Sequence, residues 1–125
     1  MDTNTINILV LAYLGDSVYE LYIREYLINK RINKANDLQT EAIKYVSANG
    51  QSRYLHSLIE DEILNEAEID IVKRARNNKG TAHPRNTDIL TYKHATALEA
   101  LIGYLYLKNN VSRIKEIINY ITKEK

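Results

Sequence analysis

Acidic side chains interrupt two otherwise apolar, helix-patterned segments of this chain. Asp16 and Glu20 fall within LGDSVYE (residues 14–20), and Glu99 falls within ALEALIGY (residues 97–104). Burying an unpaired charge costs on the order of several kcal/mol, so such carboxylates call for a cation or a basic partner. If the two helices pack side by side, Asp16 and Glu99 could share one divalent ion. Oxygen ligands, with water in the remaining positions, are the ligands that Mg²⁺ prefers.

The same carboxylates also have an ordinary structural interpretation. Asp16 and Glu20 lie four residues apart, so they share one side of a helix and repel each other by roughly a few tenths of a kcal/mol even when solvated. Both could be surface residues, and Glu99 could pair with Lys93, Arg24 or another base. Charge spacing alone leaves the two interpretations open.

The elements that would position these residues are helices. Apolar residues recur at helical spacing along the chain, and the first run shows no strand alternation. The expected helices cover residues 5–29 with a break or bend near Gly15, residues 36–46, residues 52–59, residues 66–74 after an Asn65–Glu68 capping box, a segment from Leu98 to about residue 108, and a segment capped by Ser112 that carries Ile114, Ile117, Ile118 and Ile121. Asn49-Gly50 is expected to be a turn or a helix stop, and residues 77–91 a long loop. The sequence predicts one compact all-α domain, residues 1–125, of about six helices.

Composition limits the class of protein. A chain of 125 residues is about one domain, and the absence of cysteine excludes disulfides and thiolate metal sites. The first apolar run, residues 6–14, is too short to span a bilayer, and Asp2 stands where a signal peptide would carry positive charge. We therefore expect a soluble cytoplasmic protein without a membrane partner. A net charge of +1 predicts no global attraction to nucleic acid.

Charge is nevertheless sorted along the chain. Residues 60–70 are rich in acidic side chains and contain no basic one, whereas residues 73–94 are strongly basic. The basic side chains could follow the phosphates of a duplex, and neighbouring asparagines could bind 2′-hydroxyls. The candidate RNA contacts are Arg74, Arg76, Asn77, Asn78, Lys79, His83 and Arg85. The alternative is a solvated basic cluster that balances the acidic segment. His56, His83 and His94 are scattered in the sequence, and each is expected to be a surface or loop residue rather than a catalyst.

Two motifs give the chain a resemblance to a known family. LGDSVYE (residues 14–20) resembles the signature of the ribonuclease III catalytic domain, and EALIGYLYL (residues 99–107) resembles that family's second acidic motif. Within the family, RARNNK (residues 74–79), PRN (residues 84–86) and TY (residues 91–92) are similar to Mini-ribonuclease III, the short bacterial group that lacks a double-stranded RNA-binding domain. The resemblance extends from about residue 6 to residue 110.

The resemblance implies an all-α ribonuclease III-like catalytic fold and assigns roles to the acidic residues. Asp16 and Glu99 match the family's catalytic, metal-binding carboxylates, and Glu20 matches a position with a supporting role behind them. Full-length ribonuclease III enzymes carry two further acidic residues where this chain has Ala12 and Thr96, and both departures are similar to those of the Mini group. The implied cofactor is Mg²⁺, for which Mn²⁺ could substitute.

The resemblance also implies an activity and partners. The expected reaction is Mg²⁺-dependent hydrolysis of double-stranded RNA by a homodimer, maturing the paired ends of precursor large-subunit (23S) ribosomal RNA, with a ribosomal protein assisting substrate presentation. Tyr13, Tyr19, Tyr22 and Tyr26 are available for the dimer interface or for the core. The alternatives are a catalytically inactive ribonuclease III-like scaffold that binds RNA or the ribosome, and a helical interaction module unrelated to RNA.

Overall fold

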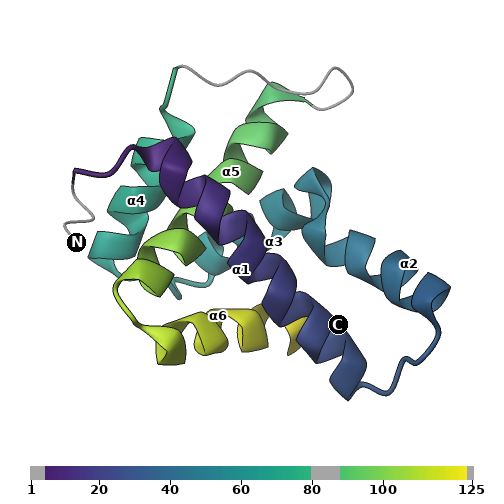
Figure 1. The fold of residues 1–125 in the computed structure, drawn as a ribbon. Helices are drawn as coiled ribbons and strands as arrows, with labels where there is room; N and C mark the ends of the chain where they lie inside the picture. The colour runs from purple at the N-terminus through teal and green to yellow at the C-terminus, as the bar shows by residue number, and fades with distance from the viewer. Residues whose placement is uncertain (1–4, 80–87, 124–125) are drawn as a thin grey trace.

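The computed structural model describes residues 5–79 and 88–123, and it is all-helical over these ranges (Figure 1). The six helices are α1 Ile8–Asn29, α2 Ala35–Val46, α3 Ala48–Glu60, α4 Glu66–Arg76, α5 Ile89–Leu107 and α6 Val111–Lys123. The expectation of an all-α domain of about six helices is confirmed. Within the described ranges, no helix is both long and apolar enough to cross a membrane.

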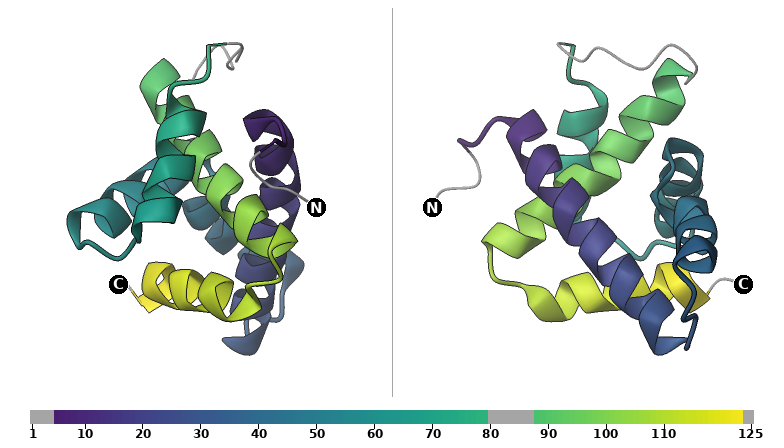
Figure 2. Two further views of the ribbon diagram at one scale, coloured as in Figure 1. Left: turned by 90° about the vertical axis from the view of Figure 1, so that its left-hand side faces the viewer. Right: turned by 45° about the vertical axis from the view of Figure 1, so that its right-hand side comes forward.

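Helix α5 is the centre of the fold. Apart from Glu99, its second half is largely apolar, as expected for a helix that other helices surround. Helix α1 makes the most extensive contact with it, α4 and α3 pack on its other sides, and α6 packs against its end. Two turned views show α1 and α5 crossing (Figure 2). Residues far apart in the sequence therefore meet where these two helices cross.

Two glycines allow α1 and α5 to touch backbone to backbone. A Cβ atom built on Gly15 would lie 1.7 Å from the carbonyl oxygen of Glu99, and one built on Gly103 would lie 2.0 Å from that of Leu11. No side chain fits at either position, so each helix packs directly on the other's main chain. The predicted break or bend near Gly15 is wrong, because α1 runs unbroken through it. Gly15 serves the packing rather than a turn.

The predicted stop at Asn49-Gly50 is also wrong. Both residues lie in the first turn of α3, where the Ser47 side chain accepts a hydrogen bond from the Gly50 N–H at 3.1 Å. A Cβ atom on Gly50 would lie 2.2 Å from the carbonyl oxygen of Lys44, so this glycine permits the tight passage from α2 to α3. The consequence is that Gln51, expected in a turn region, becomes an inward-facing helical residue.

Helix ends account for the remaining differences. The Asn65–Glu68 capping box is present as predicted. Helix α5 begins earlier than expected, because the Asp88 side chain accepts from the Thr91 N–H, so Thr91 is helical rather than part of a loop. For α6, Asn110 rather than Ser112 provides the side-chain acceptor, which the Arg113 N–H uses at 3.3 Å. The predicted buried face of α6 is confirmed by Ile114, Ile117, Ile118 and Ile121.

Candidate active site

The crossing of α1 and α5 brings Asp16 and Glu99 together. Gly15, which precedes Asp16, lies against the backbone of Glu99, and the two carboxyl groups are hydrogen-bonded to each other. Asp16 is exposed, whereas Glu99 is more deeply set. The pair therefore has one member anchored toward the interior and one at the surface, where a substrate can reach it.

The environment of Glu99 favours its protonated form. Burial, the negative charge of Asp16 and the hydrogen bond with Asp16 raise the pKa of Glu99 to about 8, and the Gln51 amide opposes this increase. At neutral pH and without a cation, the Glu99 carboxyl retains its proton and donates it in a hydrogen bond to Asp16. Two carboxyl groups this close require either a shared proton or a shared cation.

A second buried carboxylate, that of Glu68, differs from Glu99 because it is paired with a basic residue. Glu68 is 2% exposed, and both of its oxygens accept from the Arg113 guanidinium at 2.8 Å. Burial alone would raise the pKa of Glu68, but Arg113 and the Asn65 N–H more than offset it and lower the pKa. Glu99 forms no ion pair with any described basic residue, so the expected alternative of a Glu99–Arg24 or Glu99–Lys93 pair does not occur. Its partners are an acid and an amide.

Sequence reasoning missed the third member of the site, Gln51. This side chain is 1% exposed on α3, acts on Glu99, and has an Nε2 atom without a hydrogen-bond partner of normal geometry among the described residues. The signal was present: Gln51 lies on the same face as Leu55 and Leu58, a polar residue on an apolar stripe. It was hidden because the start of α3 was placed too late.

These residues fit a hard divalent cation. Mg²⁺ takes oxygen ligands, typically one or two from protein carboxylates with the rest from water and substrate. Asp16 and Glu99 supply the carboxylate oxygens, and the buried, unpartnered Gln51 amide lies beside one of them. Among residues 5–79 and 88–123, no cluster of three acidic or histidine side chains forms a closed metal cage. The two carboxylates would therefore leave coordination positions of the cation free for water and substrate.

Glu20 does not join this pair through any described contact. Its carboxylate accepts from the Arg24 guanidinium at 2.6 Å, one turn along α1, and both side chains are substantially exposed. An exposed pair of this kind contributes roughly 0.3–0.5 kcal/mol. The structure thus gives Glu20 a partner at the surface. The supporting role next to Asp16 and Glu99 that the family resemblance implies for Glu20 stays a prediction.

The basic candidates that the structure describes lie at the end of α4. Arg74 and Arg76 are half-buried in its last turn, Asn77 ends the helix, and Asn78 and Lys79 follow. Arg76 lies close enough to His94 on α5 to contribute to lowering the pKa of that imidazole, after burial and His56. The candidates His83 and Arg85 lie outside the described residues.

Two of the histidines, far apart in the sequence, are neighbours in the fold. The His56 and His94 rings meet edge to face with centroids 4.6 Å apart, and His94 Nδ1 lies 3.5 Å from the Ser52 hydroxyl. They connect α3 to α5 beside Arg76, in the same region as Gln51. Spacing in the sequence did not predict this contact, because it depends on how α3 packs against α5.

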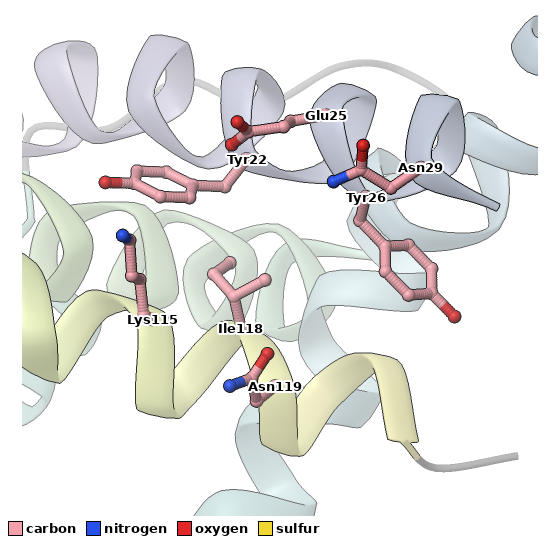
Figure 3. Close-up of a pocket in the computed structure, with 7 residues that line it drawn as sticks. All are labelled: Tyr22, Glu25, Tyr26, Asn29, Lys115, Ile118 and Asn119. Atoms are coloured by element: carbon pink, nitrogen blue, oxygen red, sulfur yellow. The ribbon is translucent and has the colours of Figure 1, made fainter.

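The hollow between α1 and α6 is a different place on the molecule (Figure 3). Its lining residues are Tyr22, Glu25, Tyr26, Asn29, Lys115, Ile118 and Asn119, so neither Asp16 nor Glu99 contributes to it. The carboxylate pair lies outside this hollow, with Asp16 exposed at the surface.

Comparison with known proteins decides the family. The model of the ribonuclease III domain matches residues 9–110. The chain is 41% identical over 120 residues to Mini-ribonuclease 3 of Streptococcus pneumoniae, covering 96% of this chain and 94% of that protein. It is 48% identical over 117 residues to Mini-ribonuclease 3 of Brevibacillus brevis, covering 94% and 86%. The chain belongs to the Mini-ribonuclease III group of the ribonuclease III family.

A solved structure agrees with this membership. The crystal structure of a Fusobacterium nucleatum protein, 38% identical, superposes with a TM-score of 0.84 over 94% of this chain and 93% of that one. For a ribonuclease III family member, Asp16 and Glu99 lie in the two acidic motifs that prompted the initial resemblance, and the structure brings these motifs into contact.

Because the pKa of Glu99 is raised, the folded state of this family member should become less stable as pH rises. The folded state holds a proton up to about pH 8, whereas an unfolded glutamate releases it near 4.5. Between these values the native state binds more protons, so the free energy of unfolding decreases as pH rises, by on the order of 2–4 kcal/mol in total. In chelator, Glu99→Gln should be more stable than wild type at pH 8.5, with the difference reduced at pH 5. Urea unfolding at both pH values measures this, and a difference that does not change with pH would contradict it.

Proposed function

We propose that this ribonuclease III family member is a Mg²⁺-dependent endoribonuclease that hydrolyses phosphodiester bonds of double-stranded RNA. The observation that carries the proposal is the meeting of Asp16 and Glu99 at the α1–α5 crossing, without a basic partner for Glu99 among the described residues. Membership of the family supplies the RNA substrate class. The proposed substrate is precursor large-subunit (23S) ribosomal RNA in the cytoplasm, presented with the help of a ribosomal protein.

Each carboxylate has its own task in this proposal. Glu99 is fixed by the contact of its own backbone with Gly15, so its carboxylate binds the cation from the protein side. Asp16 is exposed and binds the cation from the solvent side, where an RNA phosphate arrives. When bound there, Mg²⁺ would activate a water molecule and neutralise charge on the phosphoryl group. No histidine is required as a general base, and Mn²⁺ is expected to substitute.

The end of α4 is the proposed RNA contact. Arg74, Arg76 and Lys79 carry positive charge at one end of the molecule, beside the N-terminal part of α5. Helix α5 leads from this end to Glu99, so a duplex that touches the basic group can extend toward the carboxylates. Asn77 and Asn78 offer amide groups for 2′-hydroxyls in the wide minor groove of an A-form duplex. His83 and Arg85 remain proposed contacts beyond the described residues.

Replacing Arg76 with Ala should weaken duplex binding and flatten its dependence on salt. A lost phosphate contact lowers the slope of log K against log salt by about 1. Binding of an uncleaved duplex, measured in chelator between low and moderate salt, gives the slope. Arg31→Ala is the matched control, because it removes an exposed arginine that follows the C-terminal end of α1 and does not belong to the basic group at the end of α4. An Arg76→Ala slope equal to that of wild type would remove this residue from the contact surface.

We also propose a homodimer that docks through one face of α1. The exposed apolar residues Val10, Tyr13, Leu21 and Ile28 fall within about 80° of the helix circumference, and Tyr13 is 83% exposed. Asp16 lies on the same helix about 60° from the edge of this stripe, so a two-fold contact would place two sites on the same side of the dimer, as cutting both strands requires. Of the other tyrosines considered, Tyr19 is fully buried and belongs to the core. Sedimentation should give a dimer that Tyr13→Glu weakens, and a monomeric wild type would contradict the two-strand arrangement.

One experiment separates cleavage from scaffolding. The protein is incubated with a duplex and with a single strand of the same sequence, in Mg²⁺ and in chelator. The expected result is cutting of the duplex alone, stopped by chelator. Binding of duplex without cutting would favour the inactive scaffold, and neither binding nor cutting would favour an interaction module unrelated to RNA.

A further inference from the structure

Gln51 is a buried polar side chain without a complete set of partners. It is 1% exposed, and its Nε2 atom has no hydrogen-bond partner of normal geometry within the described part of the chain. Buried amides are almost always paired, because an unpaired donor loses its hydration and gains nothing in return. An apolar side chain of similar volume would avoid this cost. The unpaired Nε2 atom of Gln51 therefore needs an explanation from the groups that surround it.

The surroundings of Gln51 point to Glu99. The apolar neighbours along the inward face of α3, Leu55 and Leu58, are fully buried and offer no acceptor on their side chains. The polar group on which the Gln51 side chain acts is the Glu99 carboxyl, which is at the same time hydrogen-bonded to Asp16. Glu99 thus lies between an exposed carboxylate on one side and a buried amide on the other. Both neighbours therefore act on the same carboxyl group.

We propose that Gln51 is a positioning residue that donates a hydrogen bond from Nε2 to the Glu99 carboxylate when Asp16 and Glu99 bind the divalent cation. This inference rests on the proposed function, because it needs the cation site. Without a cation, Glu99 is held toward Asp16, and the amide acts on Glu99 without a hydrogen bond of normal geometry from Nε2. With a cation, the carboxylates no longer bond to each other, and the amide holds Glu99 in its ligating orientation. Partners of this kind behind a metal ligand change metal affinity by roughly 10–100-fold.

The first test measures cation affinity without RNA. Gln51→Met keeps a side chain of similar length and removes the amide, so we expect Mn²⁺ to bind roughly 10–100-fold more weakly by electron paramagnetic resonance titration. Thermal stability in chelator should be equal to or above that of wild type, because an unpaired buried donor has been removed. Ser52→Ala is the matched control: it removes the next buried polar group on α3, whose hydroxyl faces His94, and should leave Mn²⁺ affinity unchanged.

The outcomes distinguish this inference from the proposed function. Wild-type Mn²⁺ affinity in Gln51→Met would overturn the role of Gln51 while leaving the cation site intact. Equal loss of affinity in Ser52→Ala would also overturn it, since general loosening of α3 would then explain both. Failure of the wild-type protein to bind Mn²⁺ at all would overturn the cation site itself, and with it both proposals.

A second measurement requires no variant. The chain contains two glutamines, Gln51 and the exposed Gln39 on α2, so protein labelled selectively with ¹⁵N in the glutamine side chains has two NH₂ groups to assign. On titration with Mg²⁺, the Gln51 NH₂ protons should shift downfield and exchange more slowly with water, while those of Gln39 stay in place. Unchanged Gln51 signals at a Mg²⁺ concentration that supports cleavage would overturn the proposal.

Discussion

Replacing Asp16 with Asn should reduce the rate of duplex cleavage by at least about 10³-fold. The substitution keeps the size of the side chain and removes its charge, so a cation loses one of the two carboxylate ligands that the described structure offers. Stabilisation of transition-state charge by a bound metal amounts to several kcal/mol, and each 1.4 kcal/mol is about a factor of ten in rate. Single-turnover cleavage in saturating enzyme measures the effect on chemistry without that of product release.

Two further measurements keep this prediction specific. Asp16→Asn should bind duplex as wild type does, because the proposed RNA contacts lie at the end of α4 rather than at Asp16. Glu25→Gln is the matched control, since it removes another exposed carboxylate from the same helix, one to which no role in the reaction is assigned. Its cleavage rate should stay within about twofold of wild type. A comparable loss in both variants would show that general surface charge on α1, not the carboxylate pair, supports the reaction.

The second large effect is expected from Gly15→Ala. Alanine in place of glycine normally stabilises a helix by up to about 1 kcal/mol. Here the new Cβ atom would lie 1.7 Å from the carbonyl oxygen of Glu99, so the two helices must separate. Overpacking of this kind costs about 1–3 kcal/mol or more, which reverses the usual sign. Urea unfolding should show the destabilisation, and Mn²⁺ affinity should fall because Asp16 and Glu99 move apart.

Ser17→Ala is the control for this prediction, because Ser17 is exposed two positions further along α1. That variant should unfold at the same urea concentration as wild type or a higher one. If Gly15→Ala stabilised the protein as Ser17→Ala does, the backbone contact between α1 and α5 would not hold in solution.

The helices were largely predictable from the sequence because each carries a local signal. The isoleucines of α6 lie at helical spacing, and the Asn65–Glu68 box marks the start of α4. The sequence predicted that Asp16 and Glu99 meet only on the condition that their two helices pack side by side. No local signal determines which helices cross. Gly15 and Gly103 carried that information, but a lone glycine within a helical pattern indicates a bend as readily as a close contact.

Sequence reasoning missed Gln51 and the histidine pair for a related reason. Asn-Gly is a strong turn signal, and at residues 49–50 it was outweighed by the Ser47 cap and by the close passage of Gly50 over Lys44. Placing the start of α3 too late removed Gln51 from the inward face. The contact of His56 with His94 depends on the packing of α3 against α5, which periodicity along one helix does not encode.

The most direct test of the central claim is the anomalous scattering of Mn²⁺ in crystals of the wild-type protein. We expect a peak within ligand distance of both the Asp16 and the Glu99 carboxylate, and its absence in crystals of Asp16→Asn grown in the same way. A strong Mn²⁺ peak elsewhere on the molecule, with the two carboxyl groups still hydrogen-bonded to each other, would contradict a shared cation at the crossing of α1 and α5.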